Sequence, residues 1–142
     1  VGMYQKPFKL FKFRTMKKNT PSKASHLIDQ NSVTRFGKFI RLLKLDELPQ
    51  LINVLNGDMS LIGPRPCLPN QSELIKWREK YNLYCVKPGI TGLSQIKGID
   101  MSDPEKLAQS DFLMVSRINQ IYYFKYLLLT FFGKGRGDKV KK

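Results

Sequence analysis

The stretch that most constrains this chain runs from Leu45 to Pro66 and reads LDELPQLINVLNGDMSLIGPRP. Two adjacent carboxylates, Asp46 and Glu47, precede an apolar pattern with helical spacing. The pattern consists of Leu48, Leu51, Ile52 and Leu55. Pro49 lacks an N–H group and should lie in the first turn, which places the acidic pair at the helix N-terminus. That end of a helix favours ionised carboxylates and attracts phosphate groups.

An arginine held between two prolines follows the predicted helix. Pro64 and Pro66 each fix their own φ, and Pro66 also biases Arg65 towards an extended conformation. A guanidinium held in this way has less freedom to lose when it binds phosphate. Taken alone, the acidic pair is typical of a helix cap and Arg65 of a surface turn. Their closeness in the sequence favours a phosphate-binding site.

The run DELPQLINVLNGDMSLIGPRP resembles the signature of the bacterial sugar transferases, the monotopic phosphoglycosyl transferases. Two further segments match in the same order: KPFKLFKFRTM from Lys6 to Met16, and KPGITGLSQIKG from Lys87 to Gly98. Three ordered segments are more specific than any one of them, and the resemblance covers roughly the whole chain.

The resemblance implies an enzyme that transfers a phospho-sugar from a UDP-sugar to polyprenyl (undecaprenyl) phosphate, the first membrane step of bacterial surface glycan assembly. It also implies a covalent aspartyl phospho-sugar intermediate and release of UMP. The expected partners are the UDP-sugar, polyprenyl phosphate and an anionic membrane surface, with no nucleic acid. The expected location is the cytoplasmic face of the bacterial inner membrane.

The same resemblance assigns roles to five residues. Asp46 would be the nucleophile and a ligand of Mg²⁺, while Glu47 would deprotonate or orient the acceptor phosphate. Lys12, Arg41 and Arg65 would bind phosphate. Mg²⁺ suits this set because it commonly binds one or two carboxylates together with substrate phosphates. Many family members carry an NGR triplet where this chain reads Lys-Gly-Ile at 97–99, so no role of that arginine transfers to this sequence.

The expected fold is α+β, a mainly helical single domain over residues 1–142 with a small strand element and interfacial helices. Alternation predicts a strand over 8–14, and 60–63 is a second candidate. Further helices are expected from Thr34 as N-cap, across 70–82, and from Asp103 onwards. The segment 87–98 is expected to be an irregular loop because of its Pro and Gly content. Asp111 falls on an apolar helix face, which predicts a structural ion pair.

Charge and hydropathy leave two other functions open. The chain has 25 Lys and Arg against 11 Asp and Glu, a formal net charge of +14, so its partners should be anions. A nucleic-acid-binding module or a peripheral membrane-binding module without catalysis would also fit that charge. The two cysteines, Cys67 and Cys85, are expected to be reduced thiols.

No apolar run reaches the roughly 20 residues that cross a bilayer. Family members usually begin with a hydrophobic re-entrant segment, and its absence here suggests the catalytic portion of a longer protein. An apolar and aromatic stretch precedes a basic tail at the C-terminus. It predicts either a helix at the membrane interface or a helix packed on the domain.

Overall fold

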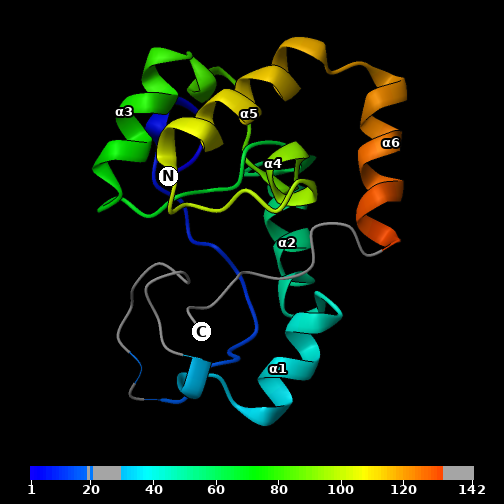
Figure 1. The fold of residues 1–142 in the computed structure, drawn as a ribbon. Coiled ribbons are helices and arrows are strands. Elements are labelled where there is room, and N and C mark those ends of the chain that lie inside the picture. The colour runs from blue at the N-terminus through cyan, green and yellow to red at the C-terminus, as the bar shows by residue number, and fades with distance from the viewer. Residues whose placement is uncertain (19, 21–29, 133–142) are drawn as a thin grey trace.

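The computed structural model describes residues 1–18, 20 and 30–132 of the chain (Figure 1). The architecture is mainly helical α+β, as predicted. The helices are α1 (Arg35–Leu42), α2 (Gln50–Leu55), α3 (Ser72–Lys80), α4 (Leu93–Ile96), α5 (Pro104–Arg117) and α6 (Gln120–Phe131). Short 3₁₀ turns occupy Met3–Gln5, Gln30–Ser32, Leu45–Glu47 and Leu83–Cys85. The prediction for the basic C-terminal tail lies outside the described residues.

No helix in the described ranges is both long enough and apolar enough to cross a membrane.

The strands β1 (Ser60–Ile62) and β2 (Gly89–Thr91) pair in parallel, with Ser60 opposite Gly89 and Ile62 opposite Thr91. The strand candidate over 60–63 is therefore confirmed. The loop predicted over 87–98 is wrong, because this segment contains β2 and α4. Gly89 of this segment allows two backbone segments to pack closely, since a Cβ at this position would overlap the backbone nitrogen of Gly63.

The strand predicted over 8–14 is not formed, although the segment is linked to its neighbours by backbone hydrogen bonds. Phe11 donates its N–H to the side-chain oxygen of Asn53 at 3.0 Å, and Phe13 donates to the Asp46 carbonyl at 3.0 Å. Thr15 accepts from the Thr34 N–H at 3.0 Å. Backbone groups of this segment thus form hydrogen bonds with the side chain of Asn53 on α2, with the acidic turn at Asp46 and with the N-cap residue Thr34. These bonds take the place of a partner strand.

Two small apolar clusters hold the upper part of the molecule together in the view of Figure 1, with α5 contributing to both. Leu107 on α5 packs with Leu74 of α3 and with Cys67. Met114, further along α5, packs with Ile62 of β1 and Tyr126 of α6. The predicted helices over 70–82 and from Asp103 are confirmed, and the Asp103 side chain caps α5 by accepting from the Lys106 N–H. Both cysteines are free thiols, as expected.

Helix α1 begins as predicted, with the Thr34 hydroxyl accepting the Gly37 N–H at 2.9 Å. Its buried residues are Gly37 and Arg41, whereas Phe36 and Phe39 are exposed. Gly37 is buried because its backbone lies against the Thr15 carbonyl, where a Cβ would clash. The apolar side chains Phe36 and Phe39 of this helix thus face outward, and Arg41 faces inward.

The central stretch divides into two elements where one helix is predicted. Asp46 and Glu47 lie in the Leu45–Glu47 3₁₀ turn, and Pro49 is the N-cap of α2 instead of a residue of its first turn. A left-handed residue, Lys44 (φ 57°, ψ 17°), separates this turn from α1. The residues of the predicted apolar pattern, Leu48, Leu51, Ile52 and Leu55, are exposed, and Leu55 reaches 86% exposure. The acidic pair therefore lies in a turn between α1 and α2.

Candidate active site

The two carboxylates of the acidic pair are buried, and each is held by cations. Lys12 Nζ lies 3.0 Å from Asp46 Oδ2 and 3.6 Å from Glu47 Oε1. Arg41 Nε lies 3.9 Å from Asp46 Oδ2, and Arg65 Nη2 donates to Glu47 Oε1 at 2.9 Å. All five residues singled out in the sequence come together at one place. Arg65 reaches the second carboxylate and not the first.

Each cation arrives from a different part of the fold. Lys12 comes from the extended N-terminal segment, and Arg41 comes from the last turn of α1. The left-handed Lys44 reverses the chain between α1 and the acidic turn, which brings Asp46 back beside Arg41. Arg65 comes from the loop after β1. The site is therefore assembled from segments that lie far apart in the sequence.

The Arg41 guanidinium is buried, and its Nε and Nη1 atoms have no hydrogen-bond partner within the described ranges. Buried polar atoms are rarely left without an acceptor in folded proteins. Three cations also exceed two carboxylates within this group, so it keeps a positive charge. An anion with several oxygens would supply the acceptors that Arg41 lacks.

Exposure divides the five residues into an outer and an inner layer. The side chains of Lys12 and Arg65 are 24% and 21% exposed, whereas that of Asp46 is 4% exposed. An incoming anion therefore meets Lys12 and Arg65 first. On this outer side, Lys12 contacts Asp46 through Oδ2.

The loop that carries Arg65 is tied by hydrogen bonds to β2 and to α3. Gly63 donates to the Thr91 carbonyl at 3.0 Å, and Gly89 donates to the Pro64 carbonyl at 2.9 Å, so the two residues before Arg65 are held against β2. Arg78 Nη1 on α3 donates to the Arg65 carbonyl at 2.7 Å. The Arg65 backbone thus has little freedom, as the flanking prolines suggest.

Arg78 also forms the ion pair predicted for Asp111. Its Nη2 donates to Asp111 Oδ2 at 2.7 Å, and the Ser94 hydroxyl donates to Oδ1 at 2.6 Å. Burial raises the pKa of Asp111, while the Arg78 guanidinium and the Ser94 hydroxyl act against that rise. Sequence reasoning missed Arg78, although its position four residues after Leu74 placed it on the inward face of α3.

A family model described as bacterial sugar transferase matches residues 1–135. The chain belongs to the bacterial sugar transferase family. One relative is an uncharacterized sugar transferase, EpsL, of Bacillus subtilis strain 168, which is 43% identical over 91% of this chain and 63% of its own length. This agrees with the resemblance carried by the three sequence segments.

Two further relatives have names that state a reaction. The UDP-glucose:undecaprenyl-phosphate glucose-1-phosphate transferase of Escherichia coli K12 is 39% identical over 92% of this chain and 30% of the relative. The UDP-N-acetylgalactosamine-undecaprenyl-phosphate N-acetylgalactosaminephosphotransferase of Aeromonas hydrophila is 35% identical over 94% of this chain and 34% of the relative. The chain spans less than two thirds of the length of these three relatives.

The metal predicted for this bacterial sugar transferase can be tested against its donor atoms. No group of three or more His, Cys, Asp or Glu residues that could hold a metal is found among the residues that the structure describes. Asp46 and Glu47 supply carboxylate oxygens, which are hard ligands of the kind Mg²⁺ prefers. The donor atoms of the acidic pair therefore suit Mg²⁺, although the described residues do not supply a complete set of protein ligands.

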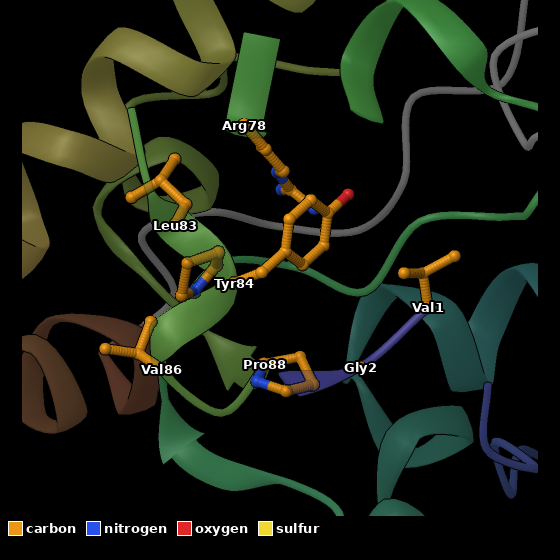
Figure 2. A pocket seen from close by; sticks show the side chains of 8 residues that line it. Val1, Gly2, Arg78, Leu83, Tyr84, Val86 and Pro88 are labelled. Atoms are coloured by element: carbon orange, nitrogen blue, oxygen red, sulfur yellow. The ribbon is translucent and has the colours of Figure 1, made fainter. Parts of the chain in front are cut away.

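A hollow of about 220 Å³, which includes space open to solvent, lies elsewhere on the transferase beside Pro64 (Figure 2). Tyr84 and Pro88 are among the residues that line it, and Arg78 points towards it. Its one charged side chain, that of Arg78, is already bonded to Asp111 and to the Arg65 carbonyl. None of the five predicted site residues lines this hollow, so it is not the candidate active site.

Proposed function

We propose that this chain is the catalytic part of a phosphoglycosyl transferase that moves a phospho-sugar from a UDP-sugar to polyprenyl phosphate. The observation that carries the proposal is the buried Asp46–Glu47 pair with three cations converging on it, at distances of 2.9 to 3.9 Å. The names of the relatives support the substrate classes, since they include UDP-sugars and undecaprenyl phosphate.

In the first step, a carboxylate oxygen of Asp46 attacks the β-phosphorus of the UDP-sugar. A new bond forms between this oxygen and phosphorus, and the bond from phosphorus to the bridging oxygen breaks. The bridging oxygen keeps the electron pair and leaves with UMP. A phospho-sugar ester of Asp46 remains on the enzyme, so that one difficult transfer is divided into two steps.

The cations make this approach of two anions possible. Lys12 and Arg65, the two partly exposed cations, would bind the incoming diphosphate, and Lys12 would leave Asp46 Oδ2 as it does so. The buried Arg41 then remains beside the carboxylate and presents its two unpartnered nitrogens to phosphate oxygens. Fixed positive charge aimed at the oxygens that gain charge lowers the barrier without reorganisation of solvent.

In the second step, an oxygen of polyprenyl phosphate attacks the phosphorus of the intermediate. The bond between phosphorus and Asp46 breaks, and the carboxylate is regenerated. Glu47 would accept the proton of the acceptor phosphate or orient it, because it is the adjacent carboxylate and Arg65 fixes its Oε1. The product is a polyprenyl diphosphate sugar.

Mg²⁺, bound through Asp46 together with the substrate phosphates, would neutralise charge on the diphosphate. The protein residues provide the remaining positive charge.

The proposed location is the cytoplasmic face of the bacterial inner membrane, with an anionic lipid surface as a partner. Large apolar side chains are exposed along α1, the following turn and α2, and again along α6. On α6, Tyr126 packs into the core while Ile121, Phe124 and Phe131 are exposed. Together with the net charge of +14, these outward apolar faces are suited to an acidic bilayer interface.

The test of catalysis requires no lipid. The protein is incubated with Mg²⁺ and a panel of UDP-sugars in the absence of acceptor, and intact-mass spectrometry records any phospho-sugar adduct. The adduct should form with one sugar class, release UMP, and be absent from Asp46→Asn. The matched control is Asp103→Asn, an exposed N-cap at which asparagine also caps the helix. An adduct that persists in Asp46→Asn would overturn the assignment of the nucleophile.

Binding experiments separate this proposal from a nucleic-acid-binding module. Non-specific binding of DNA or RNA through +14 charge should weaken steeply with salt and require no UDP-sugar. Failure to form any adduct, combined with tight salt-dependent binding of nucleic acid, would favour that alternative.

A further inference from the structure

We infer that Asn53 is a positioning residue that acts through Lys12. This inference rests on the proposed function, because it explains how the outer cation of the site is held in place. Asn53 lies on α2, six residues after Glu47, and its side chain is fully buried at 0% exposure. A buried amide is costly unless its donor and acceptor are both satisfied.

The partners of this amide are backbone atoms of the N-terminal segment. Asn53 Nδ2 donates to the Lys9 carbonyl at 2.8 Å, and Asn53 Oδ1 accepts the Phe11 N–H at 3.0 Å. The amide thus bonds the residues on either side of Leu10, as a neighbouring residue of a parallel strand would. It acts as a single-residue substitute for the missing strand partner of 8–14. Asp58 Oδ2 accepts a third, longer bond from Nδ2 at 3.3 Å.

These bonds fix the backbone immediately before Lys12. Phe13, immediately after it, is fixed by donation to the Asp46 carbonyl at 3.0 Å. Lys12 therefore projects from a short segment that is anchored on both sides, and its Nζ reaches Asp46 Oδ2 at 3.0 Å. A lysine stem has several rotatable bonds and loses considerable entropy on fixation. Anchoring of its backbone fixes the point from which the stem starts, so the main chain need not also be ordered when substrate binds.

The substitution Asn53→Ala tests this role cleanly. The backbone carbonyl of Asn53, which accepts from Asp58 and Met59 at the end of α2, is kept, so only the side-chain bonds are removed. Adduct formation from the UDP-sugar should slow by about 10- to 100-fold, the range expected for misplacement of a catalytic group. Asn119→Ala is the matched control, since it removes a helix-capping bond to Tyr122 at 3.0 Å far along the chain. Its adduct rate should equal that of the wild type.

A double-mutant cycle separates positioning from general destabilisation. If Asn53 acts through Lys12, then Lys12→Met with Asn53→Ala should be no slower than Lys12→Met alone. The pair Arg65→Ala with Asn53→Ala should instead show the product of the two single effects. Independent effects in the Lys12 cycle, or an Asn53→Ala rate equal to that of the wild type, would overturn the inference.

If Asn53→Ala does not fold, the exchange Asn53→Asp with Asp58→Asn takes its place in the same cycle. The exchange conserves net charge and keeps an acceptor for Phe11, but it removes the donor to the Lys9 carbonyl. Independent effects of this exchange and Lys12→Met, or an adduct rate equal to that of the wild type, would again overturn the inference.

A readout without activity distinguishes this inference from the proposed function. Acylation of lysines by an N-hydroxysuccinimide ester, followed by peptide mass spectrometry, should label Lys12 faster in Asn53→Ala, normalised to the exposed Lys38. If no UDP-sugar gives an adduct while Lys12 labelling rises, the proposed function fails and the positioning of Lys12 stands. Unchanged Lys12 labelling would refute the positioning even if adducts form.

Discussion

The buried ion pair between Arg78 and Asp111 offers a quantitative test of how the Arg65 loop is supported. The substitution Asp111→Ala leaves the Arg78 guanidinium, 3% exposed, without its counter-charge. Removal of one partner of a buried pair typically costs about 3–5 kcal/mol, because the other charge stays buried and unpaired. Ser94 also loses the acceptor of its hydroxyl. The expected loss therefore lies at or above the upper end of the ordinary range for point mutants, which is about 0.5–3 kcal/mol.

The thermal shift follows from the length of the chain. For 142 residues, the unfolding entropy near Tm is about 0.3 kcal/mol/K, so the expected fall in Tm is roughly 10–17 °C. Asp103→Ala, the same change at an exposed cap of the same helix, should cost only about 1 kcal/mol, or roughly 3 °C. Both can be measured by circular dichroism or scanning calorimetry.

A paired replacement identifies the source of the loss. Arg78→Met combined with Asp111→Leu removes both charges of this pair, and it should be more stable than Asp111→Ala despite its second substitution. It should still form adducts more slowly than the wild type, because the Arg65 carbonyl has lost its donor. The reasoning is refuted if Asp111→Ala melts at the same temperature as Asp103→Ala, or if the paired variant is the least stable of the three.

Four other outcomes are expected. Arg65→Ala should slow adduct formation by about 10²–10³-fold with Tm retained, as followed by intact mass and circular dichroism; unchanged turnover would remove Arg65 from the site. Gly89→Ala should lower stability by about 1–3 kcal/mol in thermal melts, because its Cβ meets the Gly63 backbone; an unchanged Tm would contradict that packing. Chelation by EDTA should abolish the adduct, and excess Mg²⁺ should restore it, with Tm unaffected; adduct formation in EDTA would exclude the metal. Burial and Cys67 raise the pKa of Tyr84 above its ordinary value of about 10. The stability of the protein should therefore fall as the pH rises above 10, and it should fall less steeply in Tyr84→Phe. The same dependence of stability on pH in both proteins would argue against Tyr84 as the cause.

Local signals in the sequence located the starts of α1 and α5 and predicted the five residues that lie together around the acidic pair. Thr34 and Asp103 are caps whose side chains bond to the N–H groups three residues later, and such bonds depend only on nearby residues. The five site residues could be assembled from the family resemblance because each lies within a recognisable segment. That Asp111 would be paired also followed from one local fact, a carboxylate on an apolar face.

The errors arose where a distant partner decided the structure. Residues 8–14 alternate like a strand, but the side chain of Asn53, more than 40 residues away, satisfies their backbone. The segment 87–98 has the composition of a loop, yet Gly89 is a strand residue because it packs against Gly63. Composition describes what a backbone can adopt, and long-range pairing selects among those conformations.

Periodicity also identified the apolar face of α2 without indicating which way it points, and α1 has a similar arrangement. On α1, the buried positions are Gly37 and Arg41, and Phe36 and Phe39 face outward. On α2, Asn53 is buried, while its apolar stripe is exposed. Thus α1 directs Arg41 to the carboxylate pair, and α2 directs Asn53 to the backbone before Lys12, while both helices expose apolar side chains. Exposed apolar faces of this extent are unfavourable in water, and an adjoining bilayer would cover them. A site held between such faces and a small core would lie beside the bilayer, where a polyprenyl phosphate presents its phosphate. The exposed apolar faces of α1 and α2 are therefore consistent with the proposed acceptor, because both require the site to lie beside a bilayer.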